Sequence, residues 1–224
     1  MIKAAVFDLD HTLYDRYETI KKVMPFFMSH FDMALPLDKA TEMMIYADKA
    51  FVHFGWERVH SYLAENGFFK TVPPFEDYRE GLLESFRSDA VEYPFTKPML
   101  DTLHQMGIKT GLITNGMSVT QRKKLQMLGL ENYLDEIIIS GELGFSKPSP
   151  EPFTEMAKRL GIAPGEMIYV GDNPYADILG ARNGGCIPVW VKTTGLWVLT
   201  DIEMAEYSVE NVGEIPMLIK ERLS

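Results

Sequence analysis

Cysteine is nearly absent from this sequence: Cys186 is the only one among 224 residues, so no disulfide can form within the chain. Proteins of oxidising compartments commonly carry paired cysteines, whereas a lone thiol is typical of a reducing compartment. The first residues lead directly into a short apolar run, without the charged start and long apolar stretch of a signal peptide. We therefore expect a cytoplasmic protein without a signal peptide.

Basic residues are also scarce. The chain has 22 lysines and arginines against 32 acidic residues, a formal net charge of −10, and no Lys/Arg-rich run. Because phosphate backbones attract clustered cations, this balance argues against nucleic acid as a partner. No apolar stretch approaches the roughly 20 residues that a membrane helix needs, so we expect no membrane partner. A hydrophobic content of 46% is ordinary for a folded domain and leaves monomer and homodimer open.

Five short apolar runs have the continuous pattern of buried parallel strands, and a weaker sixth follows them. The expected strands are 2–7, 109–114, 136–140, 167–171, 187–191 and 207–209. Helical patterns separate the later strands, at 98–106, 118–128, 151–160 and 175–183. This alternation predicts an α/β fold with a doubly wound, Rossmann-like parallel sheet.

One long segment interrupts the alternation. Residues 15–92 contain no convincing strand, and the apolar residues Ile20, Val23, Met24 and Phe27 recur with helical spacing. We therefore expect an inserted α-helical domain at 15–92 and an α/β core domain formed by residues 1–14 and 93–224.

Polar side chains follow the predicted strands where each one ends. Asp8 and Asp10 follow the first strand, and Asp172 follows the fourth. Ligands of open α/β sheets bind beyond the carboxyl ends of the strands, so we expect these residues to share one site. Clustered carboxylates repel one another unless a cation lies among them, and hard oxygen ligands favour Mg²⁺.

Two further groups are expected at the same edge. Thr114 and Asn115 end the second strand and precede a helix, where a hydroxyl, an amide and backbone N–H groups form an anion site. Lys147, in the loop after the third strand, supplies a positive charge. A metal, a lysine and an anion site around a carboxylate indicate phosphoryl transfer, in which a carboxylate can be the nucleophile.

Four segments carry a family resemblance. They are "DLDHT", "LITNG", "SKPSPEPF" and "GDNPYADILGA". In order and spacing they resemble the four motifs of the haloacid dehalogenase superfamily of hydrolases, and the resemblance covers essentially the whole chain. The helical insertion resembles the cap domain that this family places after its first motif. His11 departs from the pattern, because the family often has glycine there.

The resemblance implies roles for the three carboxylates. Asp8 matches the nucleophile that attacks phosphorus. Asp10 matches the general acid/base, which protonates the leaving group and then activates water. The expected Mg²⁺ ligands are the Asp8 and Asp172 carboxylates and the backbone carbonyl of Asp10.

The resemblance also implies roles for the remaining motif residues. Lys147 matches the lysine that neutralises the nucleophile and the phosphoryl group. The expected substrate-binding residues are Thr114, Asn115 and Gly116. Asp177 and Asn173 are expected to support the lysine and the metal site.

Taken together, these expectations describe a Mg²⁺-dependent phosphomonoester hydrolase that forms an aspartyl-phosphate. Its expected substrate is a small soluble phosphorylated metabolite such as a nucleotide, a sugar phosphate or a flavin phosphate.

A phosphomutase of the same superfamily keeps the same residues and stays open as an alternative. A dehalogenase is less favoured because a halide leaves without an acid such as Asp10. A non-catalytic phosphate-binding protein is less favoured because Asp8, Asp10 and Lys147 are all present. A signalling receiver domain is less favoured because it takes its aspartate from a later strand and has no cap.

Overall fold

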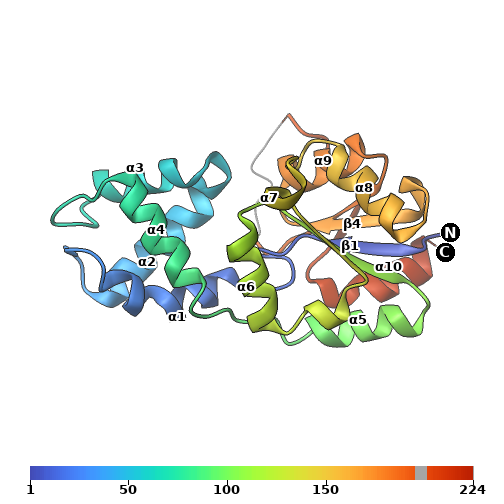
Figure 1. Cartoon of the computed structure of the whole chain (residues 1–224), viewed down its shortest axis with the longest axis horizontal. Helices are drawn as coiled ribbons and strands as arrows, with labels where there is room; N and C mark the ends of the chain where they lie inside the picture. Colours follow the sequence, from blue (N-terminus) through green and yellow to red (C-terminus); the bar gives the residue numbers. More distant parts are fainter. Residues whose placement is uncertain (195–200, 224) are drawn as a thin grey trace. The chain divides into compact units, whose positions relative to one another are not determined.

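A computed structural model describes residues 1–194 and 201–223 of the chain (Figure 1). The chain divides into two compact units. The core unit comprises Met1–Asp15 and Glu92–Ser224, and the helical unit comprises Arg16–Val91. These boundaries differ by one residue from those expected from the sequence.

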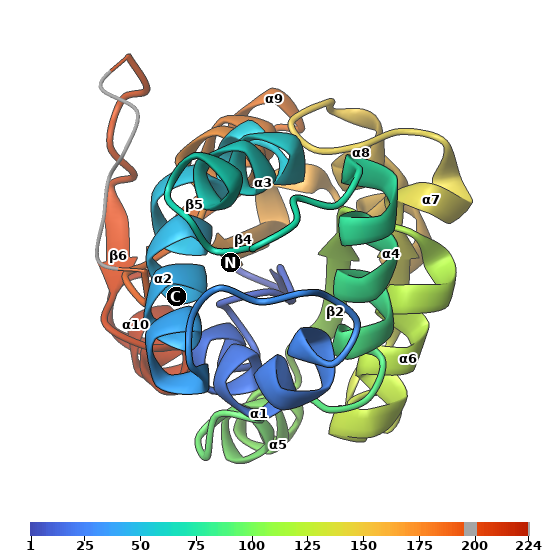
Figure 2. The same ribbon diagram turned by 90° about the vertical axis from the view of Figure 1, so that its left-hand side faces the viewer.

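The core unit contains one six-stranded parallel sheet with the order β3-β2-β1-β4-β5-β6. The strands are β1 (Ala4–Phe7), β2 (Lys109–Thr114), β3 (Glu136–Ile139), β4 (Met167–Gly171), β5 (Ile187–Val191) and β6 (Tyr207–Val209). Every expected strand is present, with small differences at the ends of the first and third. The Rossmann-like α/β fold class is therefore confirmed. Figure 2 shows β6 at one edge of this sheet, with α6 and α7 beyond the other edge.

Helices cover both faces of the sheet. In Figure 1, α8 and α9 lie on one side of β1 and β4, and α5 and α10 lie on the other. The core-unit helices are α5 (Thr96–Gln105), α6 (Ser118–Leu128), α7 (Ser140–Leu143), α8 (Glu151–Leu160), α9 (Gly180–Asn183) and α10 (Ile215–Arg222). Short turns are η2 (Glu131–Tyr133), η3 (Pro164–Glu166) and η5 (Val212–Glu214). On the α8 face, Ala4 and Val6 of β1 belong to a buried cluster with Phe153 and Met156. Their spacing of two is the period at which strand side chains return to one face.

Local sequence sets several of these helix ends. Gly129 follows α6 with φ 63°, the left-handed conformation in which glycine ends a helix at little cost. The helix expected at 175–183 begins instead as a π-helical turn, η4 (Pro174–Leu179), and continues as α9. The Asn173 side-chain oxygen accepts hydrogen bonds from the N–H groups of Tyr175 and Ala176, which caps this turn.

The helical unit has a hydrophobic core of its own. Its elements are α1 (Arg16–Met28), α2 (Leu37–Phe51), η1 (Val52–Phe54), α3 (Trp56–Glu65) and α4 (Phe75–Phe86). Phe27, Phe68 and Tyr78 are fully buried, and the Phe27 ring contacts both of the others. The expected apolar spacing of α1 is confirmed, because Ile20, Val23, Met24 and Phe27 all lie in this core. No strand occurs in residues 16–91, all of which the structure describes.

Membrane-spanning helices are absent from the part of the chain that the structure describes. No helix there is both long enough and apolar enough to cross a bilayer.

Candidate active site

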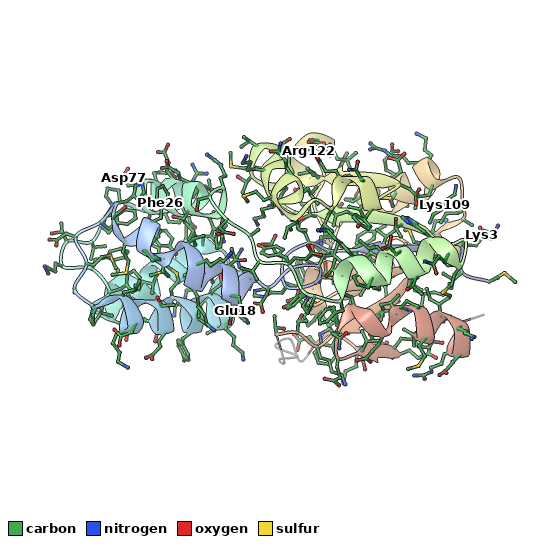
Figure 3. All side chains as sticks on the ribbon, turned by 90° about the horizontal axis from the view of Figure 1, so that it is seen from below. Lys3, Glu18, Phe26, Asp77, Lys109 and Arg122 are labelled. Atoms are coloured by element: carbon green, nitrogen blue, oxygen red, sulfur yellow. The ribbon has the colours of Figure 1, made fainter. Side chains whose placement is uncertain are left out.

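The sequence-predicted polar residues lie at the carboxyl ends of neighbouring strands. Asp8 directly follows β1, Thr114 ends β2, and Asp172 directly follows β4. Because β1 lies between β2 and β4, the three positions lie side by side at the carboxyl-terminal end of the parallel strands. Lys3 and Lys109, labelled in Figure 3, lie at the other end, beside the starts of β1 and β2.

Lys147 joins two of the acidic residues. Its Nζ lies 2.6 Å from Asp8 Oδ1, 2.7 Å from Asp177 Oδ1 and 2.8 Å from the Tyr169 hydroxyl oxygen. An ammonium group has three N–H donors, and these three contacts supply one acceptor for each. Burial opposes the charged form of Lys147, but the two carboxylates outweigh burial and raise the pKa of the lysine above its usual value. Lys147 is therefore held as a buried cation beside Asp8.

Two polar side chains hold this lysine in place. Asn115 Nδ2 donates to the Lys147 carbonyl, and the Lys147 N–H donates to Asn115 Oδ1, both at 2.9 Å. Tyr169, fully buried on β4, donates its hydroxyl to the Ile113 carbonyl on β2 at 2.9 Å. The lysine loop is thus tied to the end of β2, which carries the expected anion site.

The acidic residues form a group that fits a divalent cation. Asp8, Asp172 and Asp177 each offer one carboxylate oxygen, and these oxygens lie within 4.8 Å of one another. Burial raises the pKa of Asp8 to about 7 against the opposing charge of Lys147. Burial and the neighbouring Asp177 and Asp8 charges raise the pKa of Asp172 well above its usual value. Because one lysine leaves this charge undercompensated and all three donors are hard oxygens, the residues fit Mg²⁺.

Asn173 and Gly171 fix the position of the Asp177 side chain in this group. Its Oδ2 accepts the Asn173 N–H at 2.9 Å, so the supporting pair expected from the sequence is in contact. Gly171 makes room for Asp177: a Cβ at that glycine would lie 2.3 Å from Asp177 Cγ.

Asp10 lies near enough to Asp8 for its charge to raise the pKa of Asp8, but its carboxylate has hydrogen-bond partners of its own. Its carboxylate accepts hydrogen bonds from the Tyr14 hydroxyl, from Gln121 Nε2 at 3.2 Å and from Lys124 Nζ at 2.8 and 3.1 Å. Among the described residues, Asp10 is not one of the acids that converge on the candidate metal position. Asp8 and Asp10, two positions apart in sequence, therefore have different surroundings.

Fewer groups are available to bind an anion at the end of β2 than the sequence indicates. Thr114 Oγ1 accepts a hydrogen bond from Gln121 Nε2 at 2.6 Å. The Gly116 N–H donates to Ser140 Oγ at 3.0 Å, and the Asn115 side chain is used by the Lys147 backbone. The groups most directly suited to a phosphoryl oxygen are therefore the Thr114 hydroxyl and the Asn115 backbone N–H.

His11 occupies a backbone conformation that favours glycine. Its φ is 61°, and among the described non-glycine residues it is the one with a positive φ. Its ring is buried, and Thr193 Oγ1 donates to its carbonyl. The conformation gives a physical reason why glycine is common at this position in the family that the motifs resemble.

Four residues of the site were not found by sequence reasoning. They are Tyr14, Gln121, Lys124 and Tyr169. Tyr169 reads as one more apolar residue of a buried strand, and Gln121 and Lys124 read as the solvated face of a helix. The sequence carries a local signal only for Gln121 and Lys124, because their spacing of three places them on one helix face.

Comparison with known proteins identifies related chains. Residues 5–191 match the family model described as haloacid dehalogenase-like hydrolase. A glyceraldehyde 3-phosphate phosphatase from Methanopyrus kandleri is 36% identical over 132 residues, which are 58% of this chain and 57% of that protein. One with the same name from Methanocaldococcus jannaschii is 30% identical over 231 residues, 98% of each chain. The chain thus spans little more than half of the first relative and nearly all of the second.

A solved structure has the same fold. The crystal structure of a HAD phosphatase from Thermococcus onnurineus superposes with a TM-score of 0.64 at 26% identity, covering 97% of this chain and 98% of that one.

Proposed function

The chain belongs to the haloacid dehalogenase-like hydrolase family, and from this premise we propose that it hydrolyses phosphomonoesters through a phosphorylated Asp8. The observation that carries the proposal is the buried Lys147, whose ammonium contacts Asp8 and Asp177 together, beside Asp172. A carboxylate paired with a fixed cation at the end of a central strand is suited to attack an anionic phosphoryl group.

In the first half of the reaction, an Asp8 carboxylate oxygen attacks phosphorus. The bond from Asp8 to phosphorus forms, and the bond from phosphorus to the ester oxygen breaks with its electron pair going to that oxygen. A protonated Asp10 gives its proton to the departing oxygen. Lys147, the Thr114 hydroxyl and the Asn115 N–H stabilise the negative charge of the phosphoryl oxygens.

In the second half, Asp10 acts as the base. Its carboxylate takes a proton from a water molecule while the water oxygen bonds to phosphorus. The bond between Asp8 and phosphorus breaks, its electron pair returns to the carboxylate, and inorganic phosphate leaves. One ester and one water are consumed, and Asp8 and Asp10 regain their starting forms.

We propose Mg²⁺ as the cofactor of this site. The residues that would hold it are Asp8, Asp172 and the Asp10 backbone carbonyl, with Asp177 beside them. When bound, the ion supplies positive charge that offsets the phosphoryl oxygens and the clustered carboxylates.

The setting of Asp10 favours a phosphatase over a dehalogenase. A halide leaves without a proton, whereas an ester oxygen needs one. Asp10 lies two positions after the nucleophile, where its carboxylate can exchange that proton, and halide release has no need of such a group.

The substrate is proposed to be a small phosphorylated metabolite. Two related proteins are named for glyceraldehyde 3-phosphate, so this ester is the first to test. We propose that the helical unit, Arg16–Val91, is a cap domain that selects the substrate. A cytoplasmic location is proposed from the lone cysteine, Cys186.

Phosphate release from a panel of phosphomonoesters tests the proposal. The panel includes glyceraldehyde 3-phosphate, sugar phosphates, nucleoside monophosphates and a flavin phosphate, each assayed with Mg²⁺ and with EDTA. Asp8→Asn should abolish release because an amide does not attack phosphorus, and Asp10→Asn should slow it and trap phosphoprotein. Asp101→Asn, the same change at an exposed helix position, is the control. Full activity of Asp8→Asn would show that the nucleophile is wrongly assigned, and isomerisation of a bisphosphate without release would indicate a mutase.

A further inference from the structure

Helix α6 buries the side chains of Gln121 and Lys124, which take no part in the reaction steps proposed for Asp8 and Asp10. Gln121 and Lys124 are 3% and 4% exposed, although lysine is almost never buried unless it is paired. A separation of three residues puts them on the same face of the helix. Both reach Asp10: Lys124 Nζ lies 2.8 and 3.1 Å from its two carboxylate oxygens, and Gln121 Nε2 lies 3.2 Å from Oδ2.

Gln121 also contacts the expected phosphate site. Its Nε2 lies 2.6 Å from Thr114 Oγ1 and 3.3 Å from the Asn115 carbonyl oxygen. Gly116 leaves space for it, because a Cβ there would lie 3.2 Å from the Gln121 side-chain carbons. One amide group therefore links Asp10 to the residues at the end of β2.

Tyr14 is a third side chain that contacts the Asp10 carboxylate. It is fully buried, its hydroxyl donates to Asp10 Oδ1, and Lys124 Nζ lies 5.4 Å from the centre of its ring. Donors from three buried side chains thus fix how the Asp10 carboxylate is turned. Because all three groups donate and one is an ammonium, they favour the ionised carboxylate and fix its orientation, which suits the step in which Asp10 takes a proton from water.

We propose that Gln121 and Lys124 are positioning residues that orient the Asp10 carboxylate toward the ester oxygen. They hold it at a fixed position relative to the phosphoryl group bound at Thr114. The inference rests on the proposed function and adds a role for α6. If these residues act through Asp10, their loss harms the reactions that need proton transfer. An alkyl phosphate needs a proton on its leaving oxygen, whereas p-nitrophenolate leaves readily without one.

The test compares kcat/KM for an alkyl phosphate and for p-nitrophenyl phosphate in Lys124→Met and Gln121→Leu. We expect kcat/KM for the alkyl ester to fall about 10- to 100-fold, within the usual contribution of general acid catalysis, and that for p-nitrophenyl phosphate to change less than about threefold. Because hydrolysis of phosphorylated Asp8 also uses Asp10, kcat for p-nitrophenyl phosphate should fall. A rapid burst of p-nitrophenolate, close to one per enzyme, should then precede the slow phase.

Two variants serve as controls. Lys123→Met makes the same change at the neighbouring, exposed lysine and should behave as wild type. Lys124→Arg keeps a cation and should recover part of the alkyl phosphatase activity. If Lys124→Met does not fold, as judged by circular dichroism, Gln121→Leu and Lys124→Arg carry the test.

The outcomes separate this inference from the proposed function. Equal loss on both esters without a burst, or unchanged kinetics in Gln121→Leu and Lys124→Met, would overturn the positioning role while leaving the phosphatase intact. A wild-type protein that releases phosphate from neither ester would overturn the proposed function first.

Discussion

Tyr169 is the neutral member of the set around Lys147, and its hydroxyl has three polar contacts, the longest at 3.4 Å to Asp177 Oδ1. It accepts from Lys147 Nζ and donates to the Ile113 carbonyl, while its ring packs edge-on against Phe153. Tyr169→Phe keeps the ring but leaves a buried N–H and a buried carbonyl without this partner. We expect the free energy of unfolding to fall by about 1–3 kcal/mol, measured by urea denaturation. Tyr175→Phe, at an exposed position, should change it little, and equal stability of the two variants would contradict the role given to Tyr169.

Gly171 offers a second test at the scale of single residues. A Cβ at this position would lie 2.3 Å from Asp177 Cγ, so Gly171→Ala must displace the Asp177 side chain from Lys147. We expect a loss of about 1–3 kcal/mol of stability, typical of overpacking, and a marked drop in kcat for phosphate release. Gly165→Ala, where a Cβ meets nothing closer than 4.0 Å, is the matched control. Wild-type kcat in Gly171→Ala would show that the Lys147–Asp177 contact is dispensable.

At the scale of elements, one ion pair links α6 to α7. Arg122 Nη2 lies 2.7 Å from Glu142 Oε2, and hydrogen bonds from Arg122 and then Ser118 lower the pKa of Glu142 from 4.5 to about 2. A lowered native pKa adds stability that is present above about pH 4.5 and is lost as the pH falls toward 2. Both side chains are partly exposed, so the pair should contribute less than about 1 kcal/mol.

This ion pair is tested by Glu142→Gln. The variant should be slightly less stable than wild type in urea denaturation near neutral pH. The difference should shrink at about pH 3 and in about 1 M salt, which screens partly exposed charges. A difference that stays constant across pH and salt would show that the charge of Glu142 is not its source.

The order of elements could be predicted because each one is marked by nearby residues. Buried parallel strands such as 167–171 are continuous apolar runs, and Gly129 ends α6 at the residue expected. The π-helical start of η4 was missed because Tyr175–Ile178 has the same apolar spacing as an ordinary helix. Asp177, in the middle of this turn, is held by Lys147, which is 30 positions away in sequence, and no local pattern shows that contact.

The site could be predicted only where a residue stands in a recognisable motif. Asp8, Lys147 and Asp172 do, and they meet as expected from the ends of the strands. Lys124 does not, because "QRKK" reads as a solvated helix face. Its burial depends on Asp10, which is 114 positions away in sequence. Pairings over such distances are decided by how the helix packs, which no local pattern records.

At the scale of the whole molecule, charge decides the response to metal and pH. The chain has a net charge of −10, and at the carboxyl ends of its strands the buried Asp8, Asp177 and Lys147 lie beside the half-buried Asp172. In the metal-free protein, burial raises the pKa of Asp8 from 3.8 to about 7, so the native state binds more protons than the unfolded state between these values. Stability from this group is therefore full below about pH 4 and is lost as the pH rises through about 7.

Mg²⁺ should reverse this loss, because a divalent cation compensates the same charges that a proton does. We expect millimolar Mg²⁺ to raise Tm more at about pH 8 than at about pH 5, where protons compete for the carboxylates. At a concentration of about 100 times Kd, the gain corresponds to about 2.7 kcal/mol. Thermal unfolding with Mg²⁺ and with EDTA measures it. Asp172→Asn should remove the increment and Asp101→Asn should retain it. A Tm that Mg²⁺ raises equally in both variants would place the ion elsewhere on this acidic chain, away from the Asp8–Asp172 group.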